Sequence, residues 1–94
     1  MYARLITANV VPSQIEAFTA AFCEQILPAV SREHGFKSTY MMKNAAQNQI
    51  TVIVFWETQA DAQSNLDAYL QPPTLKHLLI DQPTAETLEV ILRA

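Results

Sequence analysis

The segment from residue 50 to residue 57 constrains the fold more than any other part of the sequence. It is rich in β-branched and aromatic residues, which favours a β-strand. Successive side chains of a strand point to opposite faces of its sheet. Both faces of this strand are apolar: one carries Ile50, Val52, Val54 and Trp56, and the other carries Ile53 and Phe55. A strand of this kind needs apolar cover on both sides.

The rest of the chain supplies three more strands and two helical regions. The first helical region is indicated by apolar residues that recur every three or four positions, such as Phe18, Phe22 and Ile26. In chain order we expect a strand at 3–11, a helix at 13–35, a strand at 36–43, a polar turn at 44–49, the strand at 50–57, a helix at 58–71, a short helix at 74–79 and a strand at 84–92. The order is therefore βαββαβ.

The boundaries of the first helix are marked by specific residues. Ser13 and Glu16 have the spacing of a capping box. Pro28 is predicted to kink the helix, because it lacks a backbone donor and its ring clashes with the preceding turn. Gly35, the only glycine in the chain, is predicted to end the helix in a left-handed conformation, with His34 in the last turn near the negative end of the helix dipole.

Threonines are predicted to begin the later helices. Thr58 is the expected N-cap of the second helix, which Pro72 and Pro73 should end. Thr74 is the expected N-cap of the short helix. On that helix Leu75, Leu78 and Leu79 define the buried side, which places His77 toward solvent.

The order of elements predicts an α+β fold, a ferredoxin-like single domain over residues 1–94 with a four-stranded antiparallel sheet. Two helices joined by short crossovers cover only one face of such a sheet. The charged fraction is 16%, below the roughly 25% of average soluble proteins. We therefore expect the sheet face opposite the helices to pack on a second copy of the chain, as a homodimer.

Composition excludes several classes of function. The six basic residues are scattered and the net charge is −3, so nucleic-acid binding is not expected. A lone Cys23, expected to be a small buried apolar residue, together with the lack of a signal-like leader and of a long apolar run, predicts a cytoplasmic protein outside the membrane. No phosphate loop, dinucleotide motif or metal-ligand spacing occurs, so we expect neither a metal nor a tightly held cofactor.

Three short segments carry a resemblance to a known family. They are Gly-Phe-Lys at 35–37, Val-Phe-Trp-Glu-Thr at 54–58, and Thr-Leu-Lys at 74–76 followed by Leu78 and Leu79. These segments resemble the corresponding stretches of the antibiotic-biosynthesis-monooxygenase (ABM) family of dimeric α+β barrels. The resemblance implies a homodimer whose two sheets form a barrel, with a pocket between sheet and helices in each subunit.

The family includes cofactor-independent oxygenases of quinol-like polyketides, quinol monooxygenases and haem-degrading enzymes, so the fold does not select one activity. Many members carry a His or Trp where this chain has Asn65, and a second His where it has Thr74. Haem-degrading relatives need an axial His at about Leu79, and leucine cannot ligate iron. With His77 expected in solvent, we do not expect haem binding.

Asn65 and Tyr69 are the candidate catalytic residues. They are four residues apart on the second helix, so an amide and a phenol can face one ligand. In a quinol oxygenase they would orient the substrate and stabilise its anion. The alternative is structural: Tyr69 packs in the core and Asn65 lies on a solvated flank.

Five further residues are candidates for substrate binding. Trp56 could form the wall of a pocket for a flat aromatic ligand, or simply pack in the core. Tyr40 and Met42 share one face of the second strand, where Met42 could adapt to a ligand or fill a gap. Thr74 occupies a family His position, and Arg4 is either a handle for an anionic group or a rim residue paired with a Glu.

These observations leave three hypotheses. The first is an ABM-like homodimer with a small apolar pocket that acts as a cofactor-independent monooxygenase on quinol-type or aromatic molecules. The second is a non-catalytic dimeric module that binds a small molecule or another protein. The third is an isomerase or lactone-processing enzyme, which would need a proton-transfer group such as His34 or His77.

Overall fold

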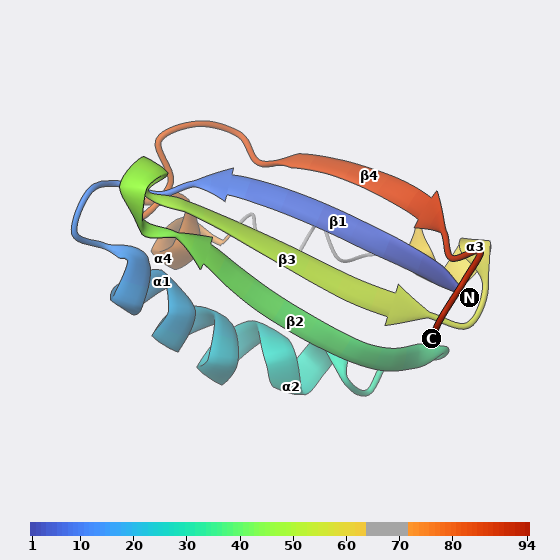
Figure 1. Cartoon of the computed structure of the whole chain (residues 1–94). Helices are drawn as coiled ribbons and strands as arrows, with labels where there is room; N and C mark the ends of the chain where they lie inside the picture. Colours follow the sequence, from blue (N-terminus) through green and yellow to red (C-terminus); the bar gives the residue numbers. More distant parts are fainter. Residues whose placement is uncertain (64–71) are drawn as a thin grey trace.

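The computed structural model describes residues 1–63 and 72–94 and contains a four-stranded antiparallel sheet (Figure 1). The strands are β1 (Tyr2–Asn9), β2 (Phe36–Asn44), β3 (Gln49–Trp56) and β4 (Thr84–Glu89). Their order across the sheet is β2-β3-β1-β4. This arrangement confirms the predicted ferredoxin-like α+β fold. Both ends of the chain lie at the same end of the sheet (Figure 1).

The strand register fixes which side chains share a face. β1 is antiparallel to both neighbours, with Ile6 opposite Val52 of β3 and Ala85 of β4. β2 pairs antiparallel with β3, with Tyr40 opposite Ile53, and its register shifts between residues 36 and 38. Directly opposed residues of neighbouring strands point to the same face.

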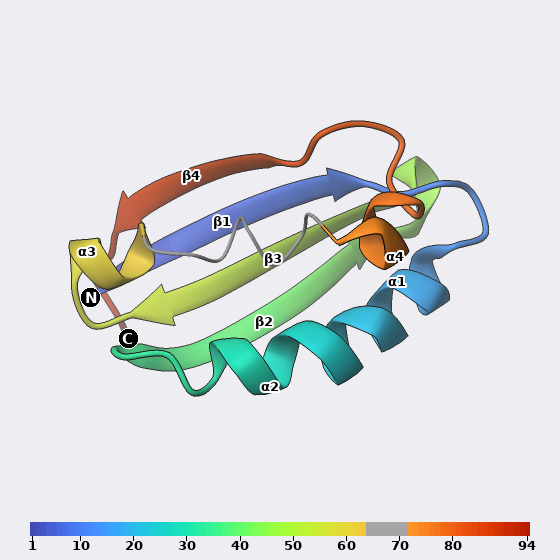
Figure 2. The same cartoon turned by 180° about the vertical axis from the view of Figure 1, so that it is seen from behind.

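All described helices lie on one face of the sheet (Figure 2). The first helical region consists of α1 (Ile15–Ala21), the π-helical segment η1 (Phe22–Ile26) and α2 (Leu27–Val30). α3 (Gln59–Ala62) and α4 (Pro73–Lys76) are short, and the 3₁₀ turn η2 (Ala45–Gln47) joins β2 to β3. Of the helix predicted at 58–71, the structure contains α3, and the prediction for residues 64–71 lies outside the described residues.

Pro28 is accommodated by a change in helix type. The Leu27 N–H bonds to the Phe22 carbonyl, five residues back, which is the π-helical pattern. A helix widened just before a proline gives room to the ring and shifts the carbonyl with which it would clash. Where a kink was predicted at Pro28, the structure has a π-helical segment directly before α2.

The hydrophobic core lies between this helix layer and the sheet, and we call this side of the sheet the covered face. The strand residues predicted for one face of β3 are all buried there, with Ile50 and Val54 fully inaccessible and Trp56 1% exposed. The rest of the core cluster is Ile6, Val10, Phe18, Phe22, Ile26, Val30, Val52, Ala62 and Leu75. Leu78 and Leu79 pack against it, which confirms the buried side predicted for the short helix.

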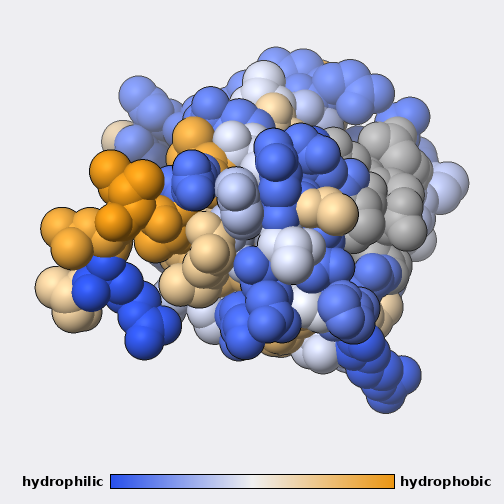
Figure 3. All heavy atoms as spheres, turned by 90° about the vertical axis from the view of Figure 1, so that its right-hand side faces the viewer, coloured by the Kyte–Doolittle hydropathy of each residue, from blue (hydrophilic) through white to orange (hydrophobic). Residues whose placement is uncertain are grey.

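The opposite side, here called the open face, is not crossed by any described helix (Figure 1). Its apolar residues are Ala3, Leu5, Tyr40, Met42, Ile53, Phe55 and Leu88. Ile53 and Phe55 are half-buried, whereas Tyr40 is 63% exposed and Leu88 is 47% exposed. Seen from the end that carries the termini, apolar atoms gather on the open-face side of the molecule (Figure 3).

Two predicted helix caps are wrong. Ser13 has a φ of +72° and lies in a turn in which the Gln14 N–H bonds to the Val11 carbonyl, so the helix begins later and no side chain caps it. α4 begins at Pro73 rather than after Thr74. Proline suits a first helical position, because its fixed φ is helical and its missing donor is not needed there.

Gly35 has the left-handed conformation predicted for it, with a φ of +82°, but the helix ends at Val30, so the helix boundary predicted at Gly35 is wrong. The N-cap predicted at Thr58 is confirmed. The Thr58 hydroxyl accepts a hydrogen bond from the Asp61 N–H at 3.2 Å, as expected of an N-cap.

Some predicted placements need correction at the level of single residues. Cys23 was expected to be buried but is exposed, because Phe22 and Ile26 fill the buried side of η1. The last strand ends at Glu89 rather than at Leu92. The first strand ends at Asn9, and Val10 then forms an isolated bridge to Leu79.

Candidate functional site

The two catalytic candidates, Asn65 and Tyr69, lie outside the described residues. Their roles therefore stay predictions. The five substrate-binding candidates are all described, and they fall into three places on the molecule.

Trp56 ends β3 on the covered face. Its ring is buried and packs edge-on against Phe36, with ring centroids 6.0 Å apart and an interplanar angle of 85°. Its Nε1 is also buried, and it has no hydrogen-bond partner among the described residues. A buried donor without a partner costs about 1–3 kcal/mol. The indole N–H is therefore a polar group that the described packing leaves unexplained.

Arg4 shares the covered face with Trp56. It lies opposite Val54 of β3, two residues along the sheet from Tyr2, which lies opposite Trp56. Its Nη1 donates a hydrogen bond to the Thr87 Oγ1 on β4 at 2.8 Å. The side chain is half-buried. A guanidinium and a buried indole N–H thus lie on one region of the covered face.

Tyr40 and Met42 lie on the open face, away from Trp56 and Arg4. The Tyr40 ring meets Phe55 edge-on at a centroid distance of 6.3 Å. Met42 is 45% exposed. The structure therefore divides the predicted binding residues between the two faces.

Thr74 lies on the outer side of α4. It is exposed, and its hydroxyl donates a hydrogen bond to the Gln25 Oε1 on η1 at 3.3 Å. Its neighbour Leu75 is buried in the core, and His77 is exposed as predicted. Thr74 thus links two helices.

Two larger hollows lie along β2. A groove of about 670 Å³ runs between β2 and the first helical region, and we call it the α1–β2 groove; it includes Met42 in its lining. A cavity of about 630 Å³ lies on the open face beneath residues 90–93 and includes Tyr40 and Phe55.

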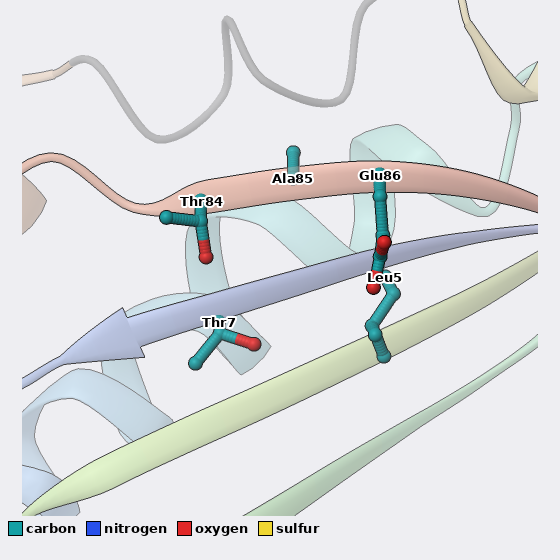
Figure 4. A pocket seen from close by; sticks show the side chains of 5 residues that line it. All are labelled: Leu5, Thr7, Thr84, Ala85 and Glu86. Atoms are coloured by element: carbon teal, nitrogen blue, oxygen red, sulfur yellow. The ribbon is translucent and has the colours of Figure 1, made fainter.

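Two smaller hollows lie elsewhere. One, of about 200 Å³, lies between β1 and β4, where Leu5, Thr7, Thr84 and Glu86 project from the open face (Figure 4). The other, of about 190 Å³, lies against the loop after α4.

Sequence reasoning missed a cluster around Asp61. The Asp61 carboxylate lies 3.1 Å from the His34 Nδ1 and accepts a hydrogen bond from the Thr58 hydroxyl at 2.9 Å. The helix-dipole role predicted for His34 is wrong, because α2 has already ended at Val30. The spacing of Thr58 and Asp61, typical of a capping box, was the available signal for half of this cluster.

This cluster shifts two pKa values. The hydrogen bond with Asp61, and the negative charge of the Asp61 carboxylate, raise the pKa of His34 above its ordinary value of 6.5. The hydrogen bonds from His34 and Thr58 lower the pKa of Asp61 below its ordinary value of 3.8. The His34 side chain is 88% exposed, so the pair lies at the surface.

Residues 1–63 and 72–94 hold no group of three His, Cys, Asp or Glu side chains that could bind a metal ion. Within the same residues, no helix has the length and apolar character that crossing a membrane requires.

The fold matches those of known proteins closely. The structure of a protein described as an antibiotic biosynthesis monooxygenase from Bordetella bronchiseptica has a TM-score of 0.80, 15% identity and 97% coverage of both chains. A monooxygenase from Streptomyces coelicolor, in complex with the ligand nanaomycin D, has a TM-score of 0.77 and 17% identity, and the match covers 99% of this chain and 92% of that protein's chain. A protein of unknown function from Nitrosomonas europaea has a TM-score of 0.76 and 23% identity, and the match covers 99% of this chain and 91% of that protein's chain.

At these identities the structural neighbours show a shared fold. No curated protein matches the chain. A model of the family described as antibiotic biosynthesis monooxygenase, however, matches residues 1–77, which is most of the chain and includes the first three strands and α1 to α4. The chain therefore belongs to the antibiotic biosynthesis monooxygenase (ABM) family.

Proposed function

We propose that this protein is a homodimer that binds a small aromatic molecule of quinol type on the covered face, and oxygenates it without a tightly bound cofactor. The observation that carries this proposal is the buried Trp56 Nε1, which has no partner among the described residues. A phenol or quinone oxygen is a suitable acceptor for that N–H, and a flat ring suits contact with an indole.

Arg4 is suited to stabilise an aromatic ligand that loses a proton and becomes an anion. It lies on the same face as Trp56 and already donates one hydrogen bond to Thr87. A guanidinium near a phenolic oxygen favours the deprotonated form, because an opposite charge stabilises the anion. The proposed roles of Asn65 and Tyr69 are to orient the ring and bind the same oxygen.

The reaction follows from this arrangement. Loss of a proton gives an electron-rich anion that reduces dioxygen directly. At a ring CH₂ group, one oxygen atom forms the new carbonyl, and the second leaves as water with the two hydrogens of that carbon. The substrate supplies all four electrons that reduce dioxygen, so no external reductant is needed. The fold shared with a monooxygenase that binds nanaomycin D supports this class of substrate.

The test uses Trp56 as a reporter, since it is the only tryptophan in the chain. Hydroquinones and anthrone-type phenols should change its fluorescence on binding, and a substrate should also cause oxygen uptake. Trp56→Phe removes the N–H and should weaken binding, measured by calorimetry, by about fivefold for the loss of about 1 kcal/mol.

Tyr40→Phe is the matched control, because it removes one polar hydrogen from the open face. If the two variants lose the same affinity, the ligand does not depend on the Trp56 N–H. If none of the phenols changes the fluorescence or consumes oxygen, the proposal is wrong.

The dimer forms, in this proposal, through the open face. Ile53 and Phe55 are half-buried, and they lie beside exposed Tyr40, Met42 and Leu88. A contiguous apolar face on so small a domain is typical of an interface between copies. The family resemblance implies the same arrangement.

A second function, a non-catalytic binding module, is favoured by one observation. Thr74, at the position of a family histidine, is linked to Gln25 rather than directed to a ligand. The two histidines that an isomerase would need, His34 and His77, are both exposed. A fluorescence change without oxygen uptake would favour the binding module.

A further inference from the structure

Thr87 holds the guanidinium of Arg4 by a short hydrogen bond. The two residues are directly opposed on β4 and β1 and share the covered face. The Arg4 Nη1 donates to the Thr87 Oγ1 at 2.8 Å, and both side chains are half-buried. β4 is the last strand of the sheet on this side (Figure 1), so the bond turns the Arg4 side chain toward the edge of the sheet.

A fixed contact at one nitrogen orients the whole guanidinium. The group is planar, and its five N–H donors have fixed directions relative to one another. The Thr87 side chain is branched at Cβ, which restricts its rotation and keeps the acceptor oxygen in one place. Thr87 therefore limits the positions from which Arg4 can donate to a ligand.

β4 also carries a competing partner for Arg4. Glu89 lies two residues after Thr87 on the same face of β4, opposite Tyr2 of β1. Such diagonal neighbours are roughly 7–8 Å apart, which two long side chains can span. Glu89 is exposed. An ion pair with its carboxylate would neutralise the guanidinium and draw it toward solvent.

We propose that Thr87 is a positioning residue, which holds the Arg4 guanidinium where it stabilises an anionic oxygen of the bound aromatic ligand and keeps it from pairing with Glu89. The inference rests on the proposed function, in which a phenol loses its proton at this site. Thr87 lies beyond residue 77, where the match to the family model ends, so the contact is an observation on this chain alone.

Two substitutions of Thr87 separate its hydroxyl from its shape. Thr87→Val removes the hydroxyl and keeps the branched side chain, which suits a strand. Thr87→Ser keeps the hydroxyl and removes the methyl group. A role in packing is therefore disturbed by Thr87→Ser, whereas a role in positioning Arg4 is lost only in Thr87→Val.

The probe is para-nitrophenol, whose ionised form absorbs visible light far more strongly than its neutral form. Quenching of the Trp56 fluorescence gives the bound fraction. At a fixed pH close to the pKa of the free phenol, the absorbance of the bound probe gives its ionised fraction. We expect wild type to favour the ionised form by about tenfold, which corresponds to a shift of about one pKa unit.

The variants should change this preference in a defined order. Arg4→Met should abolish the preference and gives the reference for complete loss. Thr87→Val should reduce it severalfold, and Thr87→Ser should keep it. Glu89→Gln in the Thr87→Val background should restore it, because the competing carboxylate is gone.

Each other outcome contradicts the proposal. If Arg4→Met abolishes the preference but Thr87→Val keeps it in full, the positioning role is wrong and the proposed site stands. If wild type does not bind the probe or does not favour its ionised form, both this inference and the role of Arg4 in the proposed function are wrong. An equal loss in Thr87→Ser would assign the effect to packing, and a double variant as weak as Thr87→Val would remove Glu89 as the competing partner.

Discussion

The two faces of the sheet are built from similar residues but have different surroundings. On β3, Val54 is fully inaccessible and the neighbouring Phe55 is only half-buried. The covered face meets a helix layer from the same chain, whereas no described helix crosses the open face. Residue type alone therefore does not distinguish the covered face from the open face.

In the proposed homodimer, the covered face depends on the chain itself and the open face depends on a partner. Burial on the covered face is complete within one copy, so its contribution to folding does not depend on protein concentration. In the proposed homodimer, burial on the open face comes from association, so its contribution should rise with protein concentration. The predictions below test this distinction, from the largest expected effect to the smallest.

The largest effect is expected on the covered face. Phe18 is 1% exposed and belongs to the core cluster. Phe18→Ala should lower the free energy of unfolding by about 3–5 kcal/mol, because it removes a buried ring and leaves a cavity. Urea unfolding at two protein concentrations should show the same loss. A loss below about 1 kcal/mol would mean that this face is not the core.

On the open face, Phe55→Glu should convert the proposed dimer to a monomer, because a charge from each copy would be buried in the interface without a partner. Light scattering or sedimentation measures the mass. Glu57→Gln, a change at the exposed end of the same segment, should leave it unchanged. An unaltered dimer mass in Phe55→Glu would move the interface to another surface.

The third prediction tests whether the point where the chain passes from helix to sheet is as constrained as the covered face. Gly35→Ala should cost about 1–2 kcal/mol of unfolding free energy, since its positive φ disfavours a side chain. A Cβ there would also collide with the Asp61 carboxylate. If Gly35→Ala costs less unfolding free energy in an Asp61→Gly background than in the wild type, the collision with Asp61 contributes to the cost. If the cost is the same in both backgrounds, it comes from the backbone conformation alone.

The smallest effect is expected at the surface, where His34 pairs with Asp61. The raised pKa of His34 means that its contribution is complete below about pH 6.5 and is lost as the pH rises through the raised value. The lowered pKa of Asp61 means that its contribution is complete above about pH 3.8 and is lost as the pH falls through the lowered value.

The melting temperature of wild type should therefore exceed that of His34→Asn most clearly near pH 5, and the difference should shrink toward pH 9. Added salt should reduce the difference, because the His34 side chain is exposed. A difference that does not change between pH 5 and pH 9 would show that the His34 charge does not contribute to it.

Much of the sheet could be predicted because strand periodicity is a local property. The alternation in residues 50–57 placed Val54 and Trp56 on one face, Thr58 was correctly predicted as a helix N-cap, and Gly35 has the predicted left-handed conformation. Ser13 and Thr74 were predicted as caps from spacing alone. Neither residue is a cap, because the turn at Val11 sets the backbone conformation of Ser13 and the helix of Thr74 begins one residue earlier, at Pro73. A rule based on spacing takes no account of these neighbours.

The candidate site was harder to predict from the sequence than the fold. Of the residues proposed to bind one ligand, Trp56 and Arg4 share the covered face, but Tyr40 and Met42 lie on the opposite face. The salt bridge of His34 and Asp61 joins residues 27 apart in sequence. Such a contact depends on how the helix layer meets the end of the sheet, which no local pattern encodes.

The sequence by itself determined the strands, the two-sided apolar character of β3 and the family. Each of these depends on residue types at fixed spacing, so neighbours along the chain are sufficient to specify it. Only the tertiary structure decided which apolar face is covered and that the Trp56 N–H is buried without a described partner. It also decided that Ile91 and Leu92 leave the sheet exposed. Burial depends on segments distant in the sequence, and their relative positions are fixed only when the whole chain packs.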